Sequence, residues 1–209
     1  MEITSVEKNK KNKNLISVFI DEKCAFSISE EDFLSMNLYE KKELSEEEIE
    51  YIKSTLSFRT AKTIAVGYLS FKLRTEMEVR EKLLNEGFVN ETIHQVIDEL
   101  KAIGYINNKI YAQKYVYDRS KLKPKSKRLL KMELIGKGIS EEIADEALEN
   151  WDVDECAVAE GLVKKKFGKY DLSDESVMKK AFMFLRHRGY KDEIIETAIN
   201  KCAQINNNE

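Results

Sequence analysis

The octapeptide EKLLNEGF at residues 81–88 returns in altered form as MELIGKGI at residues 132–139 and as MFLRHRGY at residues 183–190. The copies stand 51 residues apart, and each carries a leucine four residues before a glycine. A helix commonly ends at a residue in the left-handed conformation, which glycine adopts without strain, so each copy predicts a helix C-terminus. A unit used three times is typical of a helical repeat protein that presents a long surface. The pairs are Leu83 and Gly87, Leu134 and Gly138, and Leu185 and Gly189.

Positions that flank the octapeptide are apolar in all three copies. Their spacing predicts three helices per repeat, of which the second ends at the glycine. A bundle of about 50 residues is only marginally stable by itself, so we expect neighbouring repeats to support one another in an elongated, curved array. The flanking columns are Val79, Leu130 and Ala181, then Phe88, Ile139 and Tyr190, then Ile97, Leu148 and Ile199.

The composition agrees with a mainly α-helical fold class. The chain has 209 residues, of which 42% are hydrophobic and 35% charged, with eight glycines and one proline. A net charge of −3 produces no general attraction to nucleic acid, so such an affinity must come from local segregation of charge. No apolar run approaches the roughly 20 residues that cross a bilayer, and no signal peptide is recognisable. We therefore expect a cytoplasmic protein without membrane contact.

The sequence holds no recognisable reaction centre. Cys24, Cys156 and Cys202 lie far apart, without the close spacing of metal or redox motifs, and we expect reduced thiols. A glycine-rich phosphate loop, a metalloprotease motif and a nucleophile elbow are all missing. We expect a protein that is not an enzyme, with no catalytic residue, no metal and no cofactor.

The region before the repeats divides into two segments. Residues 1–13 are polar and rich in lysine and asparagine, and we expect a mobile tail. Residues 14–57 form an expected module in which the runs 15–20 and 24–28 make a β-hairpin. Ser29 and Ser45 each stand three residues before a carboxylate, which predicts two capped helices, the second ending near Ser57.

Three repeats are expected at residues 58–107, 108–151 and 152–205. In the first repeat, Thr75 is expected to cap the second helix and Asn90 the third. Short connections at residues 104–107 and 150–152 link consecutive repeats. Tyr105 and Trp151 lie in these connections, and we expect them to be packing residues.

Charge is segregated within the second repeat. Residues 119–137 carry eight cations and one acid, a balance of +7, whereas residues 138–155 carry eight acids and no lysine or arginine. At about 100° per residue, a helix centred on Leu130 and Leu134 places Lys125 and Arg128 on its solvent side and Lys131 on its flank. Cations of the third repeat would continue this stripe along equivalent helices. The candidates for contact with phosphate or an acidic protein surface are Arg119, Lys123, Lys125, Lys127, Arg128, Lys131, Lys179, Lys180, Arg186 and Arg188.

Two other interpretations of this charge stay open. A run of like charge is often only a solvated face. Small three-helix units also carry helix-turn-helix readers, so a sequence-specific DNA-binding transcriptional regulator is the alternative function. Residues 119–137 lack the interleaved aromatic side chains that stack on single-stranded bases, which argues against reading of individual bases.

Three motifs carry a resemblance to a known family. They are YLSFKLRTEMEVREKL at residues 68–83, GYINN at 104–108 followed by YAQKYVYDR at 111–119, and LIGKGI at 134–139. As a set they resemble the RecX family of bacterial recombinase regulators over residues 60 to 202. The chain departs from the family pattern at Asn107 and Asn108, where acids are usual, and at Lys123, where glycine often precedes the proline.

The resemblance implies tandem three-helix repeats that lie in the groove of the RecA filament on DNA. It implies a non-enzymatic regulator that binds the RecA recombinase filament and modulates its assembly and activity, with inhibition as the expected sign. The processes concerned would be recombination, DNA repair and the SOS response. We expect a monomer, with contact to single- or double-stranded DNA, where it occurs, showing no sequence preference.

Overall fold

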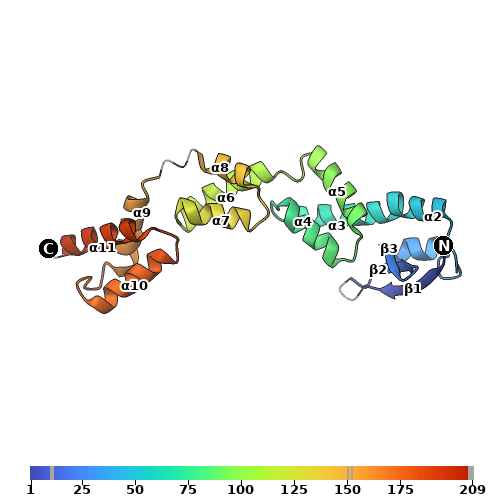
Figure 1. Cartoon of the computed structure of the whole chain (residues 1–209), viewed down its shortest axis with the longest axis horizontal. Helices are drawn as coiled ribbons and strands as arrows, with labels where there is room; N and C mark the ends of the chain where they lie inside the picture. The colour runs from blue at the N-terminus through green and yellow to red at the C-terminus, as the bar shows by residue number, and fades with distance from the viewer. Residues whose placement is uncertain (10–11, 150, 152, 207–209) are drawn as a thin grey trace. The chain divides into compact units, whose positions relative to one another are not determined.

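The computed structural model describes residues 1–9, 12–149, 151 and 153–206 (Figure 1). The chain divides into two compact units, Met1–Asn108 and Lys109–Glu209. Asn150 and Asp152, which belong to the expected connection between the second and third repeats, lie outside the described residues.

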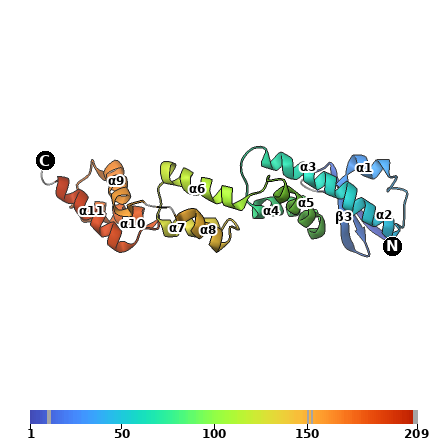
Figure 2. The same cartoon turned by 90° about the horizontal axis from the view of Figure 1, so that it is seen from above.

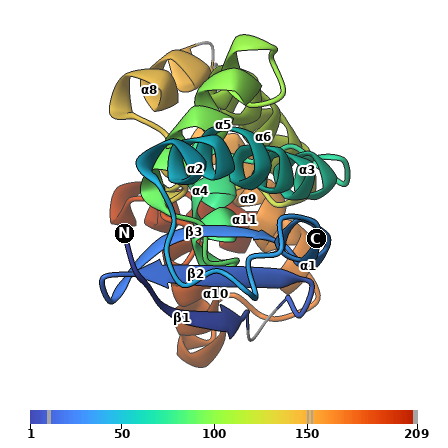
Figure 3. The same cartoon turned by 90° about the vertical axis from the view of Figure 1, so that its right-hand side faces the viewer.

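The first unit begins with a three-stranded antiparallel sheet in the order β1-β2-β3. Its strands are β1 (Ile3–Lys8), β2 (Leu15–Ile20) and β3 (Lys23–Ser29), and Figure 3 shows β2 between the other two. The expected hairpin is confirmed, because β2 and β3 pair antiparallel from Leu15 with Ser29 to Ile20 with Lys23. Val18 and Phe26, which are register partners, are both completely buried in the core on one face of the sheet.

Strand β1 differs from the expectation for residues 1–13. The sequence predicted no regular structure there, yet Val6 pairs with Val18 and Lys8 with Ile16. All its residues from Thr4 onward are exposed, so the strand shows no alternation of buried and exposed side chains. Its order comes from backbone pairing with β2, which a hydrophobic pattern cannot reveal.

Two short helices follow the sheet, and both expected caps are present. The hydroxyl of Ser29 accepts from the amide of Asp32 at the start of α1 (Glu30–Ser35), and Ser45 forms a full capping box with Glu48 at the start of α2 (Glu46–Tyr51). The sequence predicts that the second helix ends near Ser57, and this prediction is wrong. The helix continues through a π-helical turn, η1 (Ile52–Ser57), directly into α3 (Phe58–Leu69). The π turn keeps Ile52 and Leu56 in the core beneath the sheet.

The first three-helix repeat comprises α3, α4 (Glu76–Asn85) and α5 (Asn90–Ala102). Thr75 caps α4 with the expected capping box, and Gly87 follows that helix with φ of +86°. Asn90 is not the cap of α5: it is the first helical residue, and Val89 occupies the cap position without a side-chain hydrogen bond. Ile93, Val96, Ile97 and Leu100 of α5 are buried, as their spacing predicted.

The second unit contains two further three-helix bundles. The first consists of α6 (Asn108–Leu122), α7 (Lys127–Ile135) and α8 (Glu141–Glu149), and Figure 2 shows α6 beside α7 and α8. The second consists of α9 (Glu155–Phe167), α10 (Glu175–Arg186) and α11 (Asp192–Asn206). Gly138 and Gly189 have φ of +77° and +83°, which confirms the role predicted for the glycine column. Each bundle has its own core, one around Leu130 and Leu134, the other around Ala181 and Leu185.

Each unit joins two modules at one of these glycine turns. In the first unit, the hydroxyl of Ser27 on β3 donates to the carbonyl of Gly87 over 2.7 Å. In the second unit, the hydroxyl of Ser126, the cap of α7, donates to the carbonyl of Gly189 over 2.7 Å. We call these the sheet joint and the helix joint. Trp151, expected as a packing residue, packs against the core of the second repeat, whereas Tyr105 is exposed.

Candidate functional site

A groove with a volume of about 650 Å³ lies in the second unit, between the end of α6 and helices α9 and α10. Five cations line it: Lys121, Lys123, Lys165, Lys166 and Arg188. We call it the basic groove. Its remaining lining contains no acid and consists of Leu122, Pro124, Val158, Gly161, Leu162 and Phe184.

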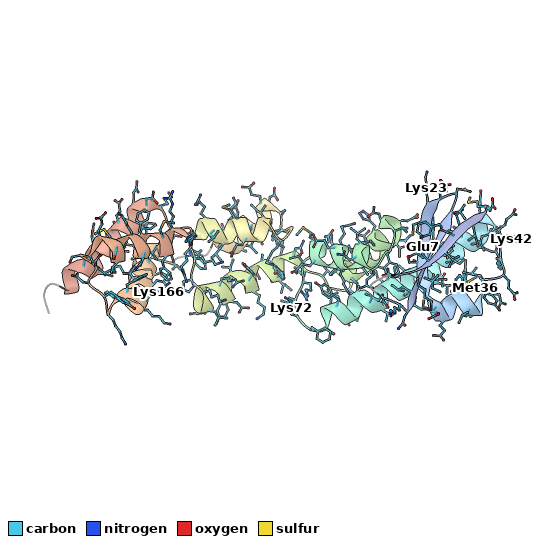
Figure 4. All side chains as sticks on the ribbon, turned by 90° about the horizontal axis from the view of Figure 1, so that it is seen from below. Glu7, Lys23, Met36, Lys42, Lys72 and Lys166 are labelled. Carbon is cyan, nitrogen blue, oxygen red and sulfur yellow. The ribbon has the colours of Figure 1, made fainter. Side chains whose placement is uncertain are left out.

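Local sequence explains how the cations reach the groove. Pro124 disfavours helical backbone at the residue before it, so α6 ends at Leu122 and leaves Lys121 and Lys123 at its terminus. Lys165 and Lys166 occupy the last turn of α9, where the negative end of the helix dipole favours cations. Lys166 is labelled on this helix in Figure 4.

One aromatic ring holds two of these cations. The guanidinium of Arg188 lies 3.8 Å from the centre of the Phe184 ring, and the amino group of Lys166 lies 4.1 Å from the same centre. Arg188 also donates to the carbonyl of Phe184 over 3.3 Å. Cations over an aromatic face are attracted by its quadrupole, so Phe184 fixes positive charge at the wall of the groove.

The charge of the basic groove is not compensated by neighbouring acids. Among the described residues, none of its five cations has an ion-pair partner within 4.0 Å, and no carboxylate lines it. Leu122 lies between two of the lysines with 78% of its surface exposed. Positive charge beside an exposed apolar side chain suits a phosphate-bearing or acidic surface that also offers an apolar contact.

Two of the predicted site residues form ion pairs with carboxylates of the same chain. Lys125 is ion-paired with Glu133, and the side chain of Lys125 is only 22% exposed. Lys131 pairs with both Glu141 and Asp145 over 2.7 Å, and hydrogen bonds to these two carboxylates raise its pKa. The charges that separate along the sequence thus meet in space, because α8 packs against α7.

Of the other eight predicted residues, two line the basic groove and six lie outside it. Lys123 and Arg188 line the basic groove, as described above. Arg119 lies over the ring of Tyr115 at 4.9 Å, and Lys179 pairs with Glu175 one turn earlier on α10. The remaining candidates are exposed but outside the groove; they are Lys127, Arg128, Lys180 and Arg186.

Three groove residues were absent from the predicted set. Lys121 was counted in the basic segment but not selected, and Lys165 and Lys166 were missed. Lys164-Lys165-Lys166 is a run of three lysines, a signal that could have been read directly. Its convergence with the end of α6 is a tertiary feature that charge counting along one segment cannot supply.

Other kinds of site find little support in the part of the chain that the structure describes. It contains no cluster of three or more histidine, cysteine or carboxylate side chains arranged for a metal ion. No helix within the described residues has the length and apolar character needed to cross a membrane. All three cysteines are free, as expected.

Comparison with known proteins assigns three segments to family models. Residues 1–45 match the N-terminal domain of regulatory protein RecX. Residues 61–100 match the first three-helix domain of RecX and residues 107–148 the second.

Full-length relatives and solved structures agree. Regulatory protein RecX from Clostridium perfringens (strain SM101 / Type A) is 31% identical over 211 aligned residues, which cover 99% of this chain and 97% of that protein. The relative from Listeria monocytogenes serotype 4a is 32% identical over 97% of this chain and 76% of its own.

Among solved structures, a crystal structure of regulatory protein RecX matches with a TM-score of 0.64 and 25% identity, covering 95% of this chain and 98% of that one. RecX from Lactobacillus salivarius matches with a TM-score of 0.60 and 29% identity over 69% of this chain and 96% of its own. Three-helix domains, sheet and near-complete alignment thus lead to one assignment: the chain belongs to the RecX family of regulatory proteins.

Proposed function

We propose that this protein is a non-enzymatic, cytoplasmic regulator that binds the RecA recombinase filament through the basic groove and inhibits filament assembly and activity. The observation that carries the proposal is the convergence of five cations without ion-pair partners on one groove in the described part of the chain. Membership of a family of regulatory proteins supports it.

A recombinase filament on DNA offers a partner both phosphates and protein surface. Its DNA carries closely spaced phosphates, and a protein that neutralises them gains affinity by releasing counterions. An acidic protein surface would be attracted by the same cations, which raise the association rate and fix the register. Contact with Leu122 would add apolar burial, worth up to about 2 kcal/mol for a fully buried side chain.

Charge reversal tests this proposal with a matched pair of variants. Lys165→Glu with Lys166→Glu removes two groove cations, and Lys42→Glu with Lys72→Glu makes the same change in net charge at two exposed lysines of the first unit, both labelled in Figure 4. Binding to RecA assembled on single-stranded DNA with ATP should weaken about tenfold or more for the first variant, since about 1.4 kcal/mol is a factor of ten. The control pair should bind within about twofold of wild type.

Bare DNA separates this function from its alternative. Any DNA binding by the wild-type protein should lack sequence preference and weaken as salt concentration rises. For single strands, the slope of log affinity against log salt concentration should shrink by about 1.4 in the Lys165→Glu, Lys166→Glu variant, which loses two phosphate contacts. Strong preference for one duplex site, with normal filament binding by the Lys165→Glu, Lys166→Glu variant, would instead establish a sequence-specific transcriptional regulator and overturn the proposal.

A further inference from the structure

A second cavity, of about 240 Å³, lies at the helix joint beside the basic groove. Pro124, Val153 and Val158 give it an apolar lining, and Trp151 and Tyr190 contribute aromatic surface. Lys121, Pro124 and Val158 line both the cavity and the basic groove, so the two adjoin. The volume is below the roughly 300 Å³ at which sites for drug-sized ligands begin, which suits a single planar ring.

Two of the side chains that line this cavity each carry a buried polar atom without a hydrogen-bond partner. Tyr190 is 3% exposed, and neither its hydroxyl nor the indole nitrogen of Trp151 has a partner among the described residues. Leaving such a group unsatisfied destabilises the folded state, because its hydrogen bonds to water are lost and not replaced. Buried polar atoms without partners are uncommon in native proteins, so the pair requires an explanation.

The repeat itself shows that packing does not require either polar atom. The column of Tyr190 holds Phe88 in the first repeat and Ile139 in the second, both buried and both without a hydroxyl. Trp151 stands 51 residues after the buried Leu100, an aliphatic side chain. A polar-tipped aromatic residue therefore replaces an apolar one in two separate columns, and both replacements line the same cavity.

The polar lining favours a neutral ligand with both acceptors and donors. The indole N–H donates only, and burial raises the pKa of Tyr190 to about 12, so its hydroxyl stays protonated and able to donate. Glu155, also in the lining, brings a carboxylate that accepts a hydrogen bond from the backbone amide of Lys127 over 2.6 Å. Glu155 would repel an acidic group placed beside it, and Lys125 is already paired with Glu133. Lys121, which the cavity shares with the basic groove, stays available for a phosphate.

We propose that this cavity binds a nucleobase, whose attached phosphate lies on the lysines of the basic groove. A nucleobase is flat and aromatic, its carbonyl oxygens or ring nitrogens can accept from the indole N–H and the tyrosine O–H, and its ring or exocyclic N–H groups can donate to Glu155. The ligand is thus a nucleotide unit, either free or as one residue of a single strand. The phosphate half of the site rests on the groove used in the proposed function, whereas the base half does not.

The sole tryptophan of the chain, Trp151, gives a direct readout, because its fluorescence reports occupation of the cavity. The probes are free deoxynucleoside monophosphates, oligothymidylate, and an abasic oligonucleotide of equal length, each titrated into the full chain. Oligothymidylate should change Trp151 emission and the abasic strand should not. The same change with free monophosphates would assign the site to free nucleotides; its restriction to the oligonucleotide would assign it to a strand.

Tyr190→Phe removes only the hydroxyl, and phenylalanine already occupies this column at residue 88. Affinity for oligothymidylate should fall about 3- to 10-fold, as expected for one lost hydrogen bond, with abasic binding unchanged. Tyr170→Phe, at an exposed tyrosine of the same unit, is the matched control and should bind as wild type does. The Lys165→Glu, Lys166→Glu variant should weaken both strands equally, which distinguishes failure of the groove from failure of the cavity.

Three results would overturn the nucleobase site. One is equal emission changes with abasic and base-bearing strands. Another is a Tyr190→Phe variant that is more stable yet binds every probe normally, which would mean that water alone fills the cavity. The last is a Trp151 response to recombinase without nucleic acid, which would assign the cavity to a protein side chain.

Discussion

The sheet joint and the helix joint contain the same kind of glycine turn, but a β-strand contacts the turn in the first and a helix N-terminus contacts it in the second. Ser27 of a β-strand binds the carbonyl of Gly87, and Ser126 at a helix N-terminus binds the carbonyl of Gly189, both over 2.7 Å. The left-handed turn that ends the second helix of a repeat therefore does two tasks. It stops the helix, and it presents a carbonyl that a serine from the preceding module can recognise.

The two joints differ in the hydrogen bonds that surround the contact between serine and glycine. At the sheet joint, Ser17 shares a 2.9 Å hydrogen bond with Ser27, and the side-chain amide of Asn9 donates to the carbonyl of Glu86. At the helix joint, Ser126 caps α7 by accepting from the amide of Leu129, and its own amide donates to the carbonyl of Arg188 over 3.0 Å. At the sheet joint several polar side chains surround Ser27. At the helix joint Ser126 bonds through both its hydroxyl and its amide, the amide of Lys127 donates to Glu155, and a cavity adjoins the contact.

Glycine replacement should reveal this difference most strongly. A Cβ atom at Gly189 would stand 2.5 Å from Cβ of Leu129 and 2.6 Å from the hydroxyl of Ser126, and the residue has φ of +83°. Gly189→Ala should therefore lower the free energy of unfolding by about 3 kcal/mol, from backbone strain together with overpacking. Denaturant titration would measure it, and an unchanged midpoint would contradict the tight contact.

Gly87→Ala is the counterpart at the sheet joint and should cost less. Its Cβ would meet the terminal nitrogen of Asn9 at 3.0 Å, and that side-chain end can move aside. Backbone strain at φ of +86° remains and is worth about 1–2 kcal/mol. Equal losses for the two glycine variants would show that the joints are packed alike.

Serine replacement should give a smaller difference in the same direction. Ser126→Ala removes a helix cap and leaves the carbonyl of Gly189 without its side-chain donor, for an expected loss of about 2 kcal/mol. Ser27→Ala leaves Ser17 and the carbonyl of Gly87 without a partner but removes no cap, and about 1 kcal/mol is expected. A larger loss for Ser27→Ala, measured by the same titration, would reverse the comparison.

Acid should weaken the helix joint slightly through Glu133, which holds Lys125 beside Ser126. Burial raises the pKa of Glu133, but hydrogen bonds from Lys125 and Tyr115 outweigh burial and set the pKa below its ordinary value. A lowered carboxyl pKa stabilises the fold above the unfolded pKa of about 4.3, and this stability is lost as pH falls through the folded value.

Glu133→Gln should therefore destabilise at neutral pH by less than about 1 kcal/mol, because solvent screens a pair of this exposure. The difference from wild type should vanish in unfolding curves recorded below the folded pKa. A difference that is constant with pH would exclude the ion pair as its cause.

Local features of the repeat could be read from the sequence because they are set by a few neighbouring residues. The left-handed glycines follow from spacing alone, and the capping boxes of Ser45 and Thr75 follow from a hydroxyl three residues before a carboxylate. Strand β1 could not be read, since it has no buried face. The continuous passage from α2 to α3 was missed because its π turn depends on packing of Ile52 and Leu56 against the sheet.

The site was harder to predict than the fold for a related reason. A count along the chain found the basic segment but could not show that Lys131 pairs with the acids of α8, or that Lys125 pairs within its own segment. It also overlooked Lys165 and Lys166, whose place in the basic groove depends on α9 lying beside the end of α6. Charge on a surface is a tertiary property, whereas helix ends are local.

The most direct measurement of whether the basic groove meets the filament is site-specific photo-crosslinking from Leu122. This side chain is 78% exposed and lies within the groove, while Tyr39, 58% exposed in the first unit, provides a control position. With RecA assembled on single-stranded DNA and ATP, a photoreactive residue at position 122 should crosslink to the filament, and excess unlabelled protein should abolish the product. A filament that binds the labelled protein with wild-type affinity but gives no crosslink from position 122 would contradict the proposed surface.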